Sequence, residues 1–169
     1  ILSFLIQEKP VSVNATGISH TRNGIEDIAY MTVNYNSDFI AHFNCSWTSP
    51  VKVRQTLIGG DKKMIVYNDL EPSEKVRIYD TGYECKEEEE KNKILVDYRT
   101  GDIYIPKLPS QEALLGVAND FIASIKTNKP PISNASVGLK VVQILEASQQ
   151  SIKNGGKEIM LNTYANSDN

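Results

Sequence analysis

The stretch around the single tryptophan holds the residues best suited to binding chemistry. Trp47 is followed by Pro50 and then by Lys52 and Arg54. A spacing of two places Lys52 and Arg54 on one face of the strand that we expect there. Two cations on one face suit an anionic group. The alternative is a core tryptophan followed by two solvated charges at a sheet edge, and the sequence leaves both interpretations open.

The sequence lacks the usual signatures of catalysis, metal binding and dinucleotide binding. Its ten glycines never form GxG, so there is neither a dinucleotide fingerprint nor a P-loop. His20 and His42 have no metal-ligand spacing and are expected on strand surfaces. No GxSxG or Cys-His pattern marks a nucleophile. We therefore expect no catalytic residue, no metal and no cofactor in this chain.

Composition narrows the class of protein. The formal net charge of -3 and a pI near 5.4 remove the basic footprint of a nucleic-acid binder. The longest apolar stretch, residues 1–6, is far shorter than the roughly 18 residues that a membrane span needs. Cys45 and Cys85 are far apart and form no CxxC, so we expect two reduced thiols in a cytoplasmic protein.

The periodicity of apolar residues changes along the chain. Short alternating segments separated by turn residues fill residues 11–105, and residues 111–126 and 136–154 follow helical spacing before a final strand at 157–161. Strands followed by helices predict an α+β fold, an open and mostly antiparallel sheet with helices packed on one face. We expect a single domain over residues 1–169.

One strand shows which face of the sheet should be buried. From residue 40 onward, Phe43, Cys45 and Trp47 alternate with polar residues that include His42 and Asn44. The Phe43, Cys45 and Trp47 face should therefore lie in the core. Residues 1–8 have helical spacing but no cap, and the earliest methionine is Met31, so we expect a fragment of a longer protein.

Several motifs follow one another in a familiar order, at residues 8–13, 24–29, 46–54, 75–80 and 112–114. Together they resemble the C-terminal domain of the glucose-fructose oxidoreductase and inositol dehydrogenase family (Gfo/Idh/MocA). Residues 46–54 are most similar to members that act on nucleotide-linked amino sugars. The resemblance implies a two-domain NAD(P)-dependent oxidoreductase, in which a Rossmann domain precedes this open-faced sheet domain.

The resemblance also implies roles for parts of the chain. It implies a substrate-binding and oligomerisation domain of a sugar or nucleotide-sugar dehydrogenase, inactive alone, with Trp47, Lys52 and Arg54 near the substrate. NAD(P) would bind only the full-length protein, which would pass hydride between a sugar carbon and nicotinamide. Lys9 follows Glu8 in a Glu-Lys-Pro tripeptide, but the family's catalytic lysine belongs to the missing domain, so Lys9 is not assigned a catalytic role.

The expected partners are a sugar or nucleotide-sugar substrate in the intact enzyme and a second copy of the chain on the open sheet face, with no nucleic acid and no membrane. Two other functions stay open. The chain could be a stand-alone module that binds a carbohydrate or anion, or a structural β-sheet dimerisation domain.

Overall fold

The structure is a computed structural model that describes residues 1–21, 24–83, 98–99, 101–109 and 112–161. The chain divides into two compact units, one made of Ile1–Pro50 with Leu114–Asn169 and the other of Val51–Ala113. Each unit is treated by itself. The single domain expected over residues 1–169 stays a prediction. Cys85 lies outside the described residues, as do residues 84–97 of the region in which short strands are expected.

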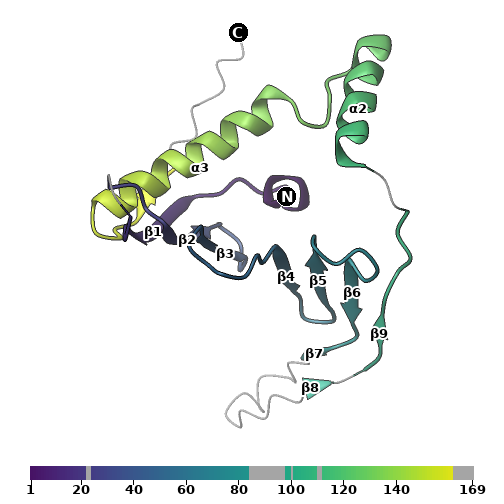
Figure 1. Cartoon of the computed structure of the whole chain (residues 1–169), viewed down its shortest axis with the longest axis horizontal. Coiled ribbons are helices and arrows are strands. Elements are labelled where there is room, and N and C mark those ends of the chain that lie inside the picture. Colours follow the sequence, from purple (N-terminus) through teal and green to yellow (C-terminus); the bar gives the residue numbers. More distant parts are fainter. Residues whose placement is uncertain (22–23, 84–97, 100, 110–111, 162–169) are drawn as a thin grey trace. The chain divides into compact units, whose positions relative to one another are not determined.

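The first unit is an antiparallel sheet with a long helix against one face (Figure 1). The strands lie in the order β10-β1-β2-β3. Their bounds are Ser12–Ile18 for β1, Ile28–Asn34 for β2, Ile40–Ser46 for β3 and Ile159–Met160 for β10. The helices are α1 (Leu2–Leu5), α2 (Ala113–Thr127) and α3 (Ala135–Lys153).

The core of this unit follows from strand register. Val13 on β1 pairs with Val33 on β2, which pairs with Ala41 on β3, so three buried apolar residues form one row across the sheet. Ile144 and Ala147 of α3 are buried against the same cluster. Because side chains alternate along a strand, the polar residues between these positions lie on the opposite face, away from the side on which α3 packs.

The second unit is a meander of short strands. Its sheet has the order β4-β5-β6-β9, with bounds Gln55–Gly59, Met64–Asn68, Val76–Tyr79 and Ile103–Tyr104. A separate pair joins β7 (Gly82–Tyr83) to β8 (Tyr98–Arg99). The pairs are antiparallel, and β4, β5 and β6, which follow one another in the chain, are joined by short connections that suit this pairing.

The α+β class and the open antiparallel sheets are confirmed, but two architectural details are wrong. In the described residues the strands form three hydrogen-bonded sheets rather than one that runs from residue 11 to 105. The break follows β3, where Pro50 has no N–H to donate to a sheet. Helix α3 packs on β1 as expected, whereas α2 has no buried residue. None of the described helices is long and apolar enough to span a membrane.

The faces expected for the side chains of β3 are correct, but the predicted burial is wrong for the C-terminal end of this strand. Ala41 is buried and Phe43 is half-buried, while His42 and Asn44 on the other face are exposed. Cys45, on the predicted core face, is exposed. Helix α3 covers this face with Ile144, Ala147, Ser148 and Ser151. Of β3, the core cluster contains Ala41, with Phe43 packed against it, so the core ends before Cys45.

Candidate functional site

Trp47 lies just beyond β3 and is 80% exposed, so the prediction that it belongs to the core is wrong. Its backbone N–H donates to the carbonyl oxygen of Asp27 at 2.9 Å. This bond fixes the backbone at the end of β3 and leaves the indole at the surface. An exposed tryptophan offers a large flat apolar face to a ligand or partner.

Lys52 and Arg54 lie before β4, which begins at Gln55, so the expected strand does not include them. The pairing explains this. Gln55 pairs with Asn68, the last residue of β5, and a further bond from the Asp69 N–H to the Arg54 carbonyl oxygen at 3.0 Å extends the ladder. Both cations are exposed. Trp47 belongs to the first unit and the two cations to the second, and the three therefore do not form one site within a single unit.

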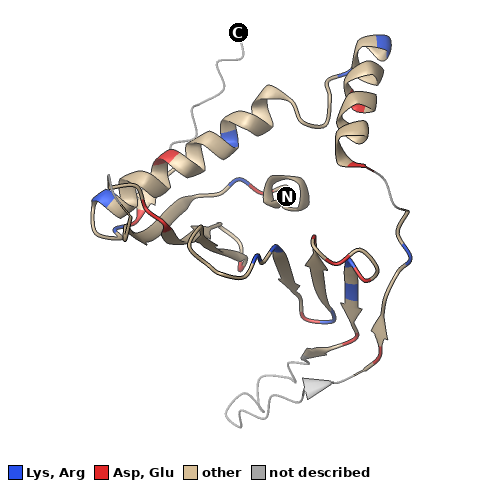
Figure 2. Ribbon diagram, in the orientation of Figure 1, with Lys and Arg blue, Asp and Glu red and all other residues tan. Residues whose placement is uncertain are grey.

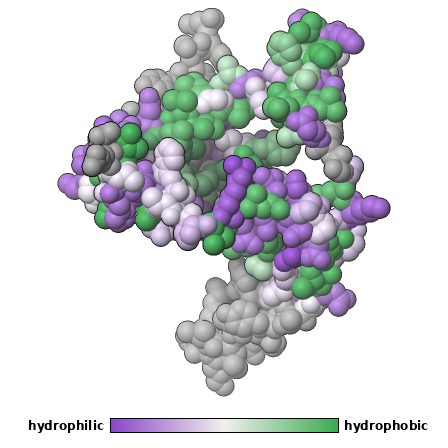
Figure 3. Space-filling model, in the orientation of Figure 1, coloured by the Kyte–Doolittle hydropathy of each residue, from purple (hydrophilic) through white to green (hydrophobic). Residues whose placement is uncertain are grey.

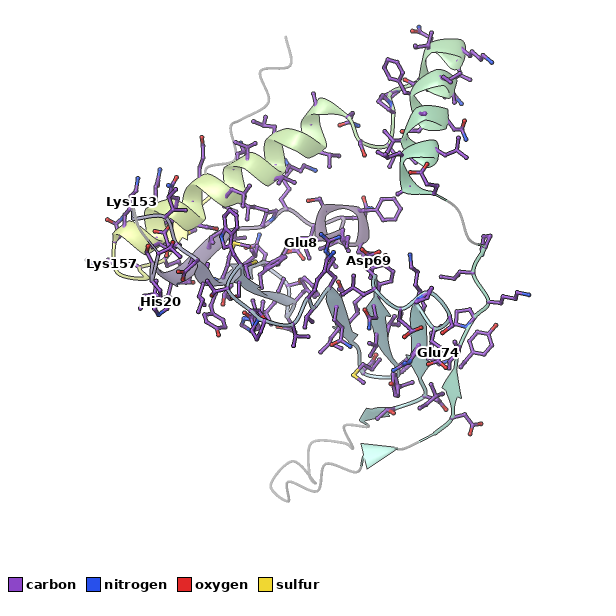
Figure 4. The ribbon with its side chains drawn as sticks, viewed as in Figure 1. Glu8, His20, Asp69, Glu74, Lys153 and Lys157 are labelled. Carbon is purple, nitrogen blue, oxygen red and sulfur yellow. The ribbon has the colours of Figure 1, made fainter. Side chains whose placement is uncertain are left out.

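Arg54 shares a carboxylate with a second cation. Its Nη1 lies 3.7 Å from Oδ2 of Asp69, and Nζ of Lys75 lies 3.7 Å from Oδ1 of the same residue. The hydroxyl of Tyr67 donates to Asp69 Oδ1 at 2.9 Å. This hydrogen bond lowers the pKa of Asp69, and the charges of Lys75 and Arg54 add to the effect. We call Arg54, Tyr67, Asp69 and Lys75 the Asp69 cluster (Figure 4 labels Asp69).

The strand registers bring these residues together. The β4–β5 hairpin pairs Gly59 with Met64 and, counted outward from that turn, sets Arg54 opposite Asp69. On the other side of β5 the Asn68 N–H donates to the Lys75 carbonyl oxygen at 2.8 Å, which brings Lys75 to the same end. Sequence reasoning missed Asp69 and Lys75. Counting register outward from the Gly59–Gly60 turn is the signal that would have found Asp69.

The cluster carries two positive charges and one negative charge. Figure 2 shows that acidic and basic residues are mixed along the ribbon. The cluster is partly exposed, since Arg54 is 60% and Asp69 39% accessible. Such a group can bind an anion at the surface, through the guanidinium fork of Arg54 in particular.

The open face of the first sheet is the second candidate surface. Asn14, Thr32 and His42 form one row across three strands, and Thr32 Oγ1 lies 3.0 Å from His42 Nδ1. Asn34 Nδ2 donates to Ser12 Oγ at 3.0 Å and to Asn14 Oδ1 at 3.2 Å. A shallow depression of about 400 Å³ is lined by Asn14, Thr32 and His42, by neighbouring residues of the same three strands and by Gly156. The face is polar and hydrogen-bonded, which suits a hydrated contact.

His20 and Asp27 form a pair at one end of the first sheet, where Figure 4 also labels Lys153 and Lys157. Asp27 is only 4% exposed, and its Oδ1 lies 2.9 Å from His20 Nδ1. Its Oδ2 accepts from the backbone N–H groups of His20 and Thr21 at 2.8 and 3.1 Å. The His20 side-chain bond is the main cause of the lowered pKa of Asp27. The carboxylate therefore acts first as a cap for this turn.

Metal chemistry finds no support in the part of the chain that the structure describes. No group of three or more His, Cys, Asp or Glu side chains there could hold a metal ion. His20 and His42 belong to different hydrogen-bonded pairs, with Asp27 and Thr32. The described residues thus offer surface groups for binding.

The comparisons with known proteins agree with this architecture. The family model described as "GFO/IDH/MocA C-terminal domain" matches residues 1–66. No curated protein matches the chain. Among solved structures, aldose-aldose oxidoreductase from Caulobacter crescentus, complexed with glycerol, has a TM-score of 0.68 at 16% identity, over 92% of this chain and 42% of that one.

Two further structures have the same fold. UDP-N-acetylglucosamine 3-dehydrogenase GnnA from Acidithiobacillus ferrooxidans has a TM-score of 0.62 at 17% identity, covering 88% of this chain and 41% of that one. Levoglucosan dehydrogenase, in complex with NADH and L-sorbose, has a TM-score of 0.67 at 14% identity, covering 90% and 45%. The chain spans less than half the length of these structures. The expected resemblance to a Gfo/Idh/MocA C-terminal domain is confirmed.

Proposed function

We propose that this chain, a C-terminal domain of the Gfo/Idh/MocA type, binds substrate and associates subunits in a cytoplasmic NAD(P)-dependent sugar or nucleotide-sugar dehydrogenase. The fold shared with sugar oxidoreductases over about nine-tenths of the chain carries the proposal. Because the chain spans less than half of each of those structures, the proposed enzyme includes a second domain outside these residues. Residues 1–169 would form one domain of it.

NAD(P) does not fit the residues of this chain. The sequence has no GxG, and in the described residues the paired strands are antiparallel, whereas a dinucleotide fold uses a parallel βαβ unit with a glycine-rich turn. We therefore place the cofactor on the other domain of the proposed enzyme. We assign no catalytic residue here, and this chain would be inactive alone.

The proposed contribution of this chain to the substrate site is Trp47, Lys52 and Arg54. All three side chains are exposed, and Arg54 lies in a cluster with an excess of positive charge. A phosphate of a nucleotide sugar would receive charge-assisted hydrogen bonds from Lys52 and Arg54. Arg54 can donate two parallel bonds to one phosphate, which a lysine cannot.

The test of this site is Arg54→Ala in the full-length gene product. Loss of one charge-assisted contact costs about 1.5 to 3 kcal/mol, so KM for a nucleotide sugar should rise roughly tenfold to a hundredfold. The melting temperature should barely change, because Arg54 is exposed and its ion pair is loose. Arg54→Lys is the matched control, since it keeps the charge and removes the fork.

An unchanged KM together with a large fall in melting temperature would show that Arg54 is structural. The coding sequence upstream of Ile1 separates the wider alternatives. A GxGxxG-bearing βαβ unit there supports the dehydrogenase, and its absence favours a stand-alone carbohydrate- or anion-binding module.

The second part of the proposal is self-association through the open face of the first sheet. This face carries the Asn14, Thr32 and His42 row and is not covered by α3, which packs on the other side. A purely structural dimerisation domain would use the same face. The KM of the Arg54→Ala variant separates the two functions: an unchanged KM for the substrate supports the purely structural domain, and a raised KM supports the substrate-binding domain.

A further inference from the structure

We propose that Asp69 is an exchangeable counter-ion in an anion site formed by Arg54 and Lys75, and that a phosphate group of the ligand replaces it as partner of the two cations. This inference rests on the proposed function, in which Arg54 receives an anionic group. It adds Lys75 as a second binding cation and assigns Asp69 the role of setting the affinity.

The distances within the Asp69 cluster support an exchange of partners. Arg54 Nη1 and Lys75 Nζ each lie 3.7 Å from an oxygen of Asp69. These separations are within the range of an ion pair but exceed the 2.7–3.2 Å of a normal N–H···O hydrogen bond. Exposed ion pairs of this kind are weak, so little free energy is lost when Arg54 and Lys75 separate from Asp69. A phosphate can accept shorter, charge-assisted bonds from both.

Tyr67 keeps the carboxylate in place without the help of the cations. Its hydroxyl donates to Asp69 Oδ1 at 2.9 Å, the one normal side-chain hydrogen bond that the structure gives this carboxylate among the described residues. Asp69 therefore stays near the site when a ligand arrives. Its negative charge repels the phosphate and lowers the affinity that Arg54 and Lys75 would otherwise provide.

The position of the cluster makes it a defined site rather than a chance meeting of mobile side chains. Arg54 and Asp69 are joined by a backbone bond of 3.0 Å beyond the β4–β5 pairing, and Lys75 is joined to Asn68 by one of 2.8 Å. Three neighbouring segments thus hold the two cations and the carboxylate at the same end of the sheet. The site is exposed enough for an ion to enter, with Lys75 and Asp69 each 39% accessible.

Inorganic pyrophosphate is the probe, titrated by calorimetry into the full-length gene product with NADH at saturation so that a dinucleotide site cannot bind it. Arg54→Ala should weaken binding about tenfold, as expected for a lost charge-assisted contact. Lys75→Ala should weaken it about threefold, and Asp69→Asn should tighten it about threefold, as expected for exposed charges.

Two control variants make the same changes in charge at the β4–β5 turn, which lies at the end of the hairpin opposite the Asp69 cluster. Lys63→Ala and Asp61→Asn should each change the affinity less than about twofold, because exposed charges at that distance are screened. Melting temperatures are measured for every variant. Should Asp69→Asn melt lower than the unaltered protein, Asp69→Ser is the second variant, since it also removes the charge and keeps a hydroxyl near Tyr67.

The outcomes separate this inference from the proposed function. Weaker binding in Arg54→Ala, with Asp69→Asn and Lys75→Ala equal to their controls, would reject the exchange and leave the proposed role of Arg54 standing. Weaker binding in a well-folded Asp69→Asn would show that Asp69 positions Arg54 and would also overturn the exchange. No saturable pyrophosphate binding by the unaltered protein would reject both.

Discussion

At the scale of single residues, the buried carboxylate of Asp27 couples stability to pH. Its pKa is lowered chiefly by the hydrogen bond with the His20 side chain. A carboxyl group whose pKa is lower in the folded state stabilises the fold at pH values above its unfolded pKa of about 3.9. That contribution disappears as the pH falls through the folded pKa.

We therefore expect stability to fall between about pH 5 and pH 2, and this fall to be smaller in Asp27→Asn, which cannot titrate at this position. The variant should also be less stable at pH 7. Urea unfolding at each pH measures both effects. Asp38→Asn, which changes an exposed carboxylate between β2 and β3, is the control. Equal pH profiles for the Asp27 variant and the unaltered protein would contradict this account.

Ser151 is a second residue whose loss should be felt. It is fully buried, and its Oγ accepts from the Ala15 N–H at 2.8 Å and donates to the Lys157 carbonyl oxygen at 2.6 Å. Strand β10 pairs with β1 at Ser12 and Val13, and at Ala15 the hydroxyl of Ser151 accepts the backbone hydrogen bond instead.

Ser151→Ala should lower the free energy of unfolding by about 1 to 3 kcal/mol, because it leaves buried backbone groups unpaired. Ser136→Ala, at an exposed position in the first turn of α3, should leave stability unchanged or slightly raised, since alanine favours helix. Denaturant unfolding of both variants makes the comparison. Equal stabilities would show that water can replace the Ser151 hydroxyl.

At the scale of the elements, α3 presents an unexpected face to its sheet. Its buried residues are Ile144, Ala147, Ser148 and Ser151. The more apolar stripe, which includes Leu139, Val142 and Leu145, is exposed in this chain. Figure 3 shows hydrophobic surface on α2 and α3. Small residues let the helix lie close to β1, which explains why the least bulky face packs there.

The start of α3 depends on one cap. Asn134 has extended backbone geometry, and its side-chain oxygen accepts from the Val137 N–H at 3.1 Å. Asn134→Ala should reduce the free energy of unfolding by about 1 kcal/mol, and Asn134→Ser should largely restore it. Thermal and denaturant unfolding measure the difference. Equal losses in both variants would mean that the cap is not the cause.

At the scale of the whole molecule, the proposed contact between copies uses the open face of the first sheet. Tyr30 lies in the central strand of this face and is 55% exposed. We expect a dimer or larger assembly by light scattering. Tyr30→Lys should shift it toward monomer, because a charge is placed within the proposed contact. Gln150→Lys, exposed on α3, is the control. A strict monomer at high protein concentration would contradict the proposal.

Much of the fold could be predicted because it depends on local patterns. Alternation with a period of two placed the start of β3 at residue 40, where the structure has it, and helical spacing located α2 and α3 within two residues of their bounds. The face of β3 that holds Ala41 and Phe43 was also correct. Element type and the face that a side chain takes depend on the spacing of apolar and polar residues along the chain. The sequence alone contains that spacing.

The tertiary structure alone decided the rest, because it depends on what packs against each segment. Alternation places Trp47 on the core face of β3, but α3 stops covering that face before the strand ends, and Trp47 remains exposed. Likewise, Arg54 and Lys75 lie on opposite sides of β5, and only the pairing of β5 with both β4 and β6 brings these two cations to the same carboxylate. Pairing between strands is a long-range choice, and the properties of the proposed anion site follow from it.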